Sequence, residues 1–173
     1  MSSAAHHEGN LEQRAREFAT LAHERVGQRR KYTNEPYIVH PAAVVELVRS
    51  VPHDEAMLCA AWLHDTVEDC GVGLDEIERV FGHDVATLVA HLTDVSKPSD
   101  GNREARKAVD RAHTAQACAR AKTIKLADLI DNTHSIVERD PAFAKIYLRE
   151  KALLLDVLVE GDATLQAQAR AML

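Results

Sequence analysis

The sequence of 173 residues is poor in aromatic residues, glycine and proline. Aromatic side chains make up 4% of the chain, with only seven glycines and five prolines. This scarcity argues against a β-sandwich or barrel and favours helices. Hydrophobic residues at 46% and charged residues at 28% are typical of a folded domain and exclude disorder over the whole chain. The length fits one domain.

The chain also lacks a long apolar run, a secretory signal and paired cysteines. Its longest apolar run covers the eight residues 56–63, whereas a membrane span needs about 18 residues. The N-terminus has no basic segment followed by an apolar stretch. The three cysteines form no CxxC motif and indicate free thiols in a reducing compartment. We therefore expect a cytoplasmic protein with no membrane partner.

An excess of positive charge is absent as well. The formal net charge is −6, which argues against a nucleic-acid partner. A small anionic substrate stays compatible with this charge, because a bound metal and a local basic cluster can reverse the sign at one site. No feature of the sequence specifies an oligomeric state.

Apolar residues recur at helical spacing through most of the chain, and no segment has the pattern of a strand. We therefore predict an all-α protein of about eight to ten helices. Residues 1–10 are expected to form a flexible tail, and residues 11–173 one compact domain. The main helices are expected at residues 11–26, 41–50, 54 to between 64 and 69, 74–81, 84–92, 103–120 with a break near residue 113, 121–137 and 141–160.

The strongest chemical signal is the segment HDTVED at residues 64–69, which directly follows the apolar run. If the helix continues, His64 stacks on Glu68 and Asp65 on Asp69 at i, i+4 spacing. Imidazole and carboxylate groups at one helix end form the nucleus of a divalent metal site. A His-Asp pair alone is weak evidence, because residues 53–54 and 83–84 carry the same pair. A helix end with solvated charges is the competing interpretation.

Two residues elsewhere extend this candidate site. His40 precedes Pro41 at the start of a predicted helix, and Asp128 lies on the amphipathic helix at 121–137. Together with His64 and Asp65 they provide two imidazoles and two carboxylates, a plausible four-ligand set with positions left for water and substrate. Such mixed ligands favour Mn, Fe, Zn or Ni over Mg alone.

Taken in order, these motifs resemble the HD-domain phosphohydrolases. Within them they resemble the small alarmone hydrolases of the RelA/SpoT-homologue group, the Mesh-type single-domain enzymes. The resemblance covers about residues 14 to 155 and implies a single compact helical domain of the HD type. It is carried by residues 29–31 (RRK), 35–41 (EPYIVHP), 60–69 (AAWLHDTVED), 81–82 (FG) and 125–128 (KLAD), with Asn132.

The resemblance implies a role for each of ten residues. The four candidate ligands would hold one metal ion, usually manganese in this group, and two acidic residues would position and activate the attacking water. The implied reaction removes the 3′-pyrophosphate of guanosine tetra- or pentaphosphate, giving GDP or GTP and pyrophosphate. Tyr147 is equally well explained as a core aromatic residue. The implied sets are His40, His64, Asp65 and Asp128 for the metal, Glu68 and Asp69 for catalysis, and Arg30, Lys31, Asn132 and Tyr147 for the nucleotide.

The sequence departs from the family pattern near the substrate. Leu129 replaces a basic residue of many members, Asp131 replaces a neutral or aromatic one, and Lys97 stands one place late. An HD phosphohydrolase for another nucleotide therefore stays open, such as an adenosine analogue, a nucleoside monophosphate or a nicotinamide dinucleotide phosphate. A metal-binding helical module without turnover is a third interpretation, although a pure binder has no need of Glu68 and Asp69. Only 45 residues follow Asp128, so we expect a hydrolase without a synthetase half.

Overall fold

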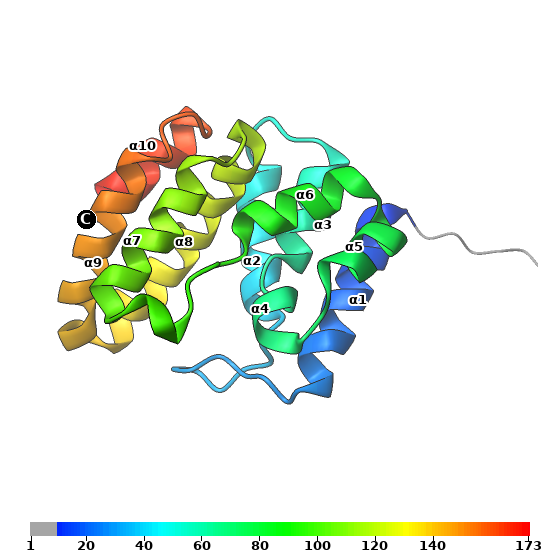
Figure 1. Ribbon diagram of the computed structural model, residues 1–173, viewed down its shortest axis with the longest axis horizontal. Coiled ribbons are helices and arrows are strands. Elements are labelled where there is room, and N and C mark those ends of the chain that lie inside the picture. Colours follow the sequence, from blue (N-terminus) through cyan, green and yellow to red (C-terminus); the bar gives the residue numbers. More distant parts are fainter. Residues whose placement is uncertain (1–9) are drawn as a thin grey trace, which may run out of the picture.

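A computed structural model describes residues 10–173, whereas residues 1–9, and with them most of the predicted tail, lie outside the described residues. Within residues 10–173 there are ten α-helices and no β-strand, which confirms the predicted all-α class (Figure 1). Arg29 and Pro36 form an isolated bridge. The helices are α1 (Leu11–Arg25), α2 (Val39–Arg49), α3 (Glu55–Leu63), α4 (Thr66–Cys70), α5 (Leu74–Phe81), α6 (His83–Leu92), α7 (Arg103–Ala115), α8 (Ala119–Arg139), α9 (Pro141–Asp156) and α10 (Ala163–Ala171), with a 3₁₀ turn, η1, at Pro98–Asp100.

The core is organised around α3 and α8. Helix α3 packs against α1, α2, α6 and α8, and it buries every residue from 57 to 63. A helix that is apolar on all sides must be enclosed by others, and α3 lies behind α6 in Figure 1. Helix α8 also packs against α2, α6, α9 and α10, so it connects helices of the N-terminal half of the chain with the two C-terminal helices. None of the helices in the described part of the chain could cross a membrane.

The helix expected to continue towards residue 69 instead ends at Leu63 and restarts as α4. Two side chains at the junction bind the last carbonyl groups of α3. His64 Nδ1 donates to the carbonyl of Ala61 at 2.7 Å, and Thr66 Oγ1 donates to that of Leu63 at 2.8 Å. Because these carbonyls are satisfied locally, the chain can turn here. Helix α4 ends at Cys70 and is capped by Gly71, whose φ of +69° lies in the left-handed region.

Several helix boundaries also differ from the predicted ones. The break expected near residue 113 lies at residues 116–118, where the buried ammonium of Lys122 donates to the carbonyl of Ala115 and so satisfies the end of α7. Helix α2 begins at Val39, two residues before Pro41, and α9 ends at Asp156 rather than near residue 160. Val137, the last residue of the amphipathic helix predicted at 121–137, is 45% exposed.

Candidate metal and nucleotide site

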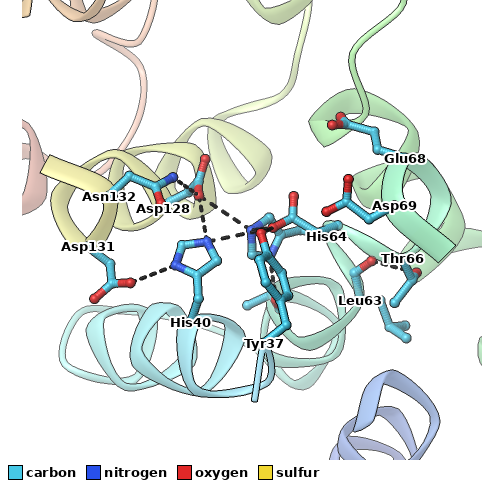
Figure 2. Close-up of polar contacts among 12 residues, drawn as sticks. Tyr37, His40, Leu63, His64, Thr66, Glu68, Asp69, Asp128, Asp131 and Asn132 are labelled. Carbon is cyan, nitrogen blue, oxygen red and sulfur yellow. Dashed lines mark hydrogen bonds and ion pairs between the residues drawn. The ribbon is translucent and has the colours of Figure 1, made fainter. Parts of the chain in front are cut away.

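The structure brings the four residues proposed as metal ligands together from three parts of the fold, and Figure 2 shows three of them, His40, His64 and Asp128. His40 lies in the first turn of α2, His64 and Asp65 form the turn between α3 and α4, and Asp128 lies on α8. His40 Nε2 is 3.0 Å from Asp128 Oδ1 and 3.7 Å from Asp65 Oδ2. His64 Nε2 is 3.1 Å from Asp65 Oδ2 and 3.4 Å from Asp128 Oδ1. Ligand atoms of His40, His64 and Asp65 all lie within 4.8 Å of one another.

Both imidazoles are oriented so that Nε2 faces the carboxylates. His64 Nδ1 donates to a backbone carbonyl, and His40 Nδ1 lies 2.6 Å from Asp131 Oδ2, which can only accept when ionised. Each neutral ring then has a lone pair on Nε2. His64 Nε2 is buried and has no hydrogen-bond partner. Lone pairs that face carboxylates repel them unless a proton or a cation lies between, so this cluster fits a divalent cation.

The local charges favour a cation in the same place. Burial lowers the pKa of His40 and His64, but the carboxylates beside them outweigh it and raise both pKa values. Burial raises the pKa of Asp65 and Asp128, but neighbouring groups outweigh it. These are His64 and His40 at Asp65, and Lys125 followed by the two histidines at Asp128, and both pKa values fall below the usual range. The carboxylates are thus ionised at neutral pH.

Three residues beside the cluster had no role in the sequence analysis. The Tyr37 hydroxyl donates to Asp65 Oδ2 at 2.6 Å. Burial and then the negative charge of Asp65 raise the pKa of Tyr37, so its hydroxyl keeps the proton that it donates. Lys125 Nζ lies 2.8 Å from Asp128 Oδ2. Lys125 and Asp131 stand three residues before and after Asp128, so helical spacing could have indicated both.

The two candidate catalytic carboxylates lie on α4, beside the cluster (Figure 2). Glu68 Oε1 accepts the backbone N–H of Asp94 at 2.6 Å, and Asp69 Oδ2 accepts Gln28 Nε2 at 3.1 Å. Within residues 10–173 neither carboxylate forms a hydrogen bond or an ion pair with a candidate ligand. The turn after Leu63 removes the predicted stacking of Glu68 on His64. Desolvation and then the charge of Asp94 raise the pKa of Glu68 to about 7, and desolvation also raises that of Asp69.

Two candidate nucleotide contacts connect to the cluster through α8. Asn132 Nδ2 donates to Asp128 Oδ1 at 2.9 Å. Arg30 donates to Ser135 Oγ at 3.2 Å and to Asn132 Oδ1 at 3.5 Å. Arg30 therefore lies beside the face of α8 that carries Asp128.

The other two candidate nucleotide contacts lie further out. Lys31 is exposed, and its ammonium lies 5.3 Å from the centroid of the Tyr32 ring. The Tyr147 hydroxyl donates to the carbonyl of Leu129 at 3.3 Å, and burial raises the pKa of Tyr147 to about 12. Tyr147, Asn132 and Asp128 line one cavity of about 170 Å³ between α7, α8 and α9.

The sequence around this site matches a known protein family. The HD domain family matches residues 15–153, which is most of the chain. The chain therefore belongs to the HD-domain family, as the motifs around His40, His64 and Asp128 indicated.

Its relatives include curated alarmone hydrolases. It is 36% identical over 128 residues to guanosine-3′,5′-bis(diphosphate) 3′-pyrophosphohydrolase MESH1 of Drosophila melanogaster, covering 72% of this chain and 69% of that one. It is 35% identical over 133 residues to a probable enzyme of the same name from Synechocystis, where it spans only 18% of the relative's length. The solved structure of a metazoan ortholog of SpoT that hydrolyses ppGpp matches with a TM-score of 0.83 and 29% identity, over 97% of this chain and 96% of that one.

Proposed function

We propose that this chain is a metal-dependent phosphohydrolase that removes the 3′-pyrophosphate of guanosine tetra- or pentaphosphate, giving GDP or GTP and pyrophosphate. The observation that carries the proposal is the pair of buried Nε2 atoms facing two ionised carboxylates. The similarity to MESH1 and to a SpoT ortholog that hydrolyses ppGpp supports the choice of substrate.

In this proposal His40, His64, Asp65 and Asp128 hold one divalent ion. Manganese is the first choice from the family resemblance, and Fe, Zn or Ni suit the same mixture of nitrogen and oxygen ligands. When bound, such an ion lowers the pKa of water and neutralises charge on a phosphate oxygen.

Glu68 and Asp69 would orient the attacking water and take its proton. A general base works best when its pKa lies near the working pH, and the pKa of Glu68 is about 7. Gln28 donates to Asp69 and limits the positions that this second carboxylate can take.

The nucleotide would be held outside the metal ligands. Arg30 and Lys31 supply positive charge for its base and phosphate region, and Arg30 is already oriented by α8. Asn132 supplies an amide for the ribose. Tyr147 supplies an aromatic wall of the adjoining cavity.

A substrate panel tests the proposal. The protein with manganese is given guanosine tetraphosphate, guanosine pentaphosphate, an adenosine analogue, a nucleoside monophosphate and NADPH, and both pyrophosphate and the product nucleotide are measured. We expect the highest kcat/KM for the guanosine substrates. Exclusive turnover of another nucleotide would overturn the substrate, and no turnover by metal-loaded protein would overturn the activity.

Two variants test whether the activity in this panel depends on the candidate metal ligands. His64→Gln should lose metal and turnover together. His83→Gln is the matched control, because His83 belongs to another His-Asp pair and its side chain is 83% exposed. Equal activity of the two variants would contradict the assigned site.

A further inference from the structure

Lys151, on α9, is buried inside the molecule without a polar partner. It is 1% exposed, and its Nζ atom has no hydrogen bond within residues 10–173. Lys122 offers a comparison, since it is 3% exposed but donates to the carbonyl of Ala115 and to Glu160 Oε2. A buried ammonium is costly unless it is paired. The chain itself supplies hydrogen-bond partners for the ammonium of Lys122, whereas a partner for the ammonium of Lys151 must come from outside the described residues.

Lys151 lines the 170 Å³ cavity that also contains Asp128, Asn132 and Tyr147. Two cations of α7, Lys107 and Arg111, line the same cavity and form no ion pair within the described residues.

Most carboxylates that line the cavity already have hydrogen-bond or ion-pair partners within the described residues. Asp110 accepts the backbone N–H groups of Val95 and Ser96, Glu150 pairs with Arg103, and Asp128 pairs with Lys125. Asp94 is the remaining carboxylate of the lining. Three cations without an ion-pair partner therefore share the cavity with Asp94 and Asp110, the two lining carboxylates that no cation pairs with in the described residues. The lining thus has one more unpaired positive charge than unpaired negative charges, in a protein that is acidic as a whole.

We propose that Lys151, together with Lys107 and Arg111, binds the phosphate groups of the nucleotide that are not cleaved. This inference rests on the proposed function, whose tetraphosphate substrate carries a diphosphate at both its 3′ and its 5′ positions. The candidate metal ligands come from α2, the α3–α4 turn and α8, whereas these cations come from α7 and α9. The two sets can therefore hold the two phosphorylated ends of one molecule.

Two properties of Lys151 fit this role. Burial lowers the pKa of its ammonium to about 8, so the group is still mainly charged at neutral pH. The ammonium is covered in this structure, but the four-carbon stem can rotate it towards the cavity, and a charge in a low-dielectric interior acts over a longer range than in water.

The test uses Lys151→Met, which keeps the length of the side chain and removes the charge. We expect KM for guanosine tetraphosphate to rise at least tenfold, with kcat within threefold of wild type. For an analogue without 5′-phosphates, KM should stay within twofold. The control is Lys145→Met, an exposed lysine of the same helix, which should leave both KM values unchanged. If Lys151→Met fails to fold, Arg111→Gln takes its place, because Arg111 is a half-buried residue of α7 in the cavity lining. This variant should also raise KM for guanosine tetraphosphate.

Binding of inorganic pyrophosphate to metal-free protein, measured by calorimetry, separates this inference from the proposed function. A loss of affinity of at least tenfold in Lys151→Met supports the cationic subsite, even if wild type fails to hydrolyse guanosine tetraphosphate and the proposed function falls. Pyrophosphate affinity and KM within twofold of wild type would overturn the inference. An equal rise in KM for the substrates with and without 5′-phosphates would also overturn it.

Discussion

Glu68 is the carboxylate whose environment best suits proton transfer at neutral pH. The backbone N–H of Asp94 fixes one of its oxygens at 2.6 Å, while desolvation and the charge of Asp94 bring its pKa to about 7. Asp69 has a different partner, the amide of Gln28. The two adjacent carboxylates are therefore held by different segments of the chain and can be tested separately.

Glu68→Gln should reduce kcat about 10²–10⁴-fold, or roughly 3–5 kcal/mol of barrier, with metal content unchanged. The amide keeps the shape of the side chain but cannot accept a proton. In wild type, kcat should rise as the pH increases through about 7, because the deprotonated base becomes more abundant. The variant should lose this rise.

The measurement is kcat for pyrophosphate release between pH 5.5 and 9, recorded beside the metal content of each sample. Asp69→Asn is the matched variant. A loss of less than about tenfold in Glu68→Gln, together with a large loss in Asp69→Asn, would assign the base to Asp69 instead.

Asp131 departs from the family pattern and yet contacts the candidate site. It accepts the Nδ1 proton of His40 at 2.6 Å and so keeps Nε2 free to bind a cation. Removing such a partner commonly weakens metal binding by about 10–100-fold, so Asp131→Asn should raise the metal dissociation constant by this factor. Titration calorimetry with manganese measures it, with His134→Gln, an exposed neighbour on α8, as control. An affinity within threefold of wild type would show that the orientation of His40 does not depend on this carboxylate.

The helices differ in how far local sequence determines them. Asp54 and Asp140 each accept a hydrogen bond from a backbone N–H of the following first turn, and both starts could be predicted from a capping residue. The end of α3 could not, because it depends on side chains of His64 and Thr66 that bind its last carbonyls. The spacing of apolar residues carries no information about these contacts.

The same distinction applies to the site. The four candidate ligands were indicated by motifs, and the packing of α2 and α8 on α3 brings them together. The partners Tyr37 and Asp131 are 28 and 91 residues away from the groups that they contact. Helical spacing could place Asp131 beside Asp128, but its contact with His40 and that of Tyr37 with Asp65 form only when the helices are packed, so local pattern could not indicate these contacts.

The segment between α1 and α2 is attached to the C-terminal half of the chain. Arg30 contacts Ser135 on α8, and the Tyr32 hydroxyl donates to Asp140 at 3.0 Å. This attachment orients Arg30 towards the candidate nucleotide contacts, whereas Lys31 is exposed beside the Tyr32 ring.

Arg30→Ala and Lys31→Ala should both raise KM more than they lower kcat, because each loses a ground-state contact. The effect should be larger for Arg30→Ala, which also releases Asn132. Steady-state kinetics with guanosine tetraphosphate measures both values, and Arg25→Ala, an exposed arginine at the end of α1, is the control. If KM stays unchanged in both variants, the basic segment is only a solvated surface.

The candidate ligands connect three parts of the molecule that are distant in sequence. Helix α2, the α3–α4 turn and α8 meet at the cluster, and between them they contact most of the other helices. Without a metal ion, protons on the imidazoles balance the two buried carboxylates, as the raised pKa values of His40 and His64 indicate. A metal ion takes the place of these protons and needs the packed helices to bring its ligands together, so the affinity for metal and the stability of the fold are coupled.

This coupling predicts that manganese raises the melting temperature. A ligand at about 100 times its dissociation constant stabilises the native state by about 2.7 kcal/mol, which for a domain of this size corresponds to roughly 5–10 °C. Elemental analysis of protein purified without added metal or chelator should find one transition metal per chain. Asp128→Asn should lose both the metal and most of the thermal shift, whereas His83→Gln should keep them. Absence of metal, together with an unchanged melting temperature on adding manganese, would exclude these residues as a metal site, because a ligand that binds only the native state must stabilise it.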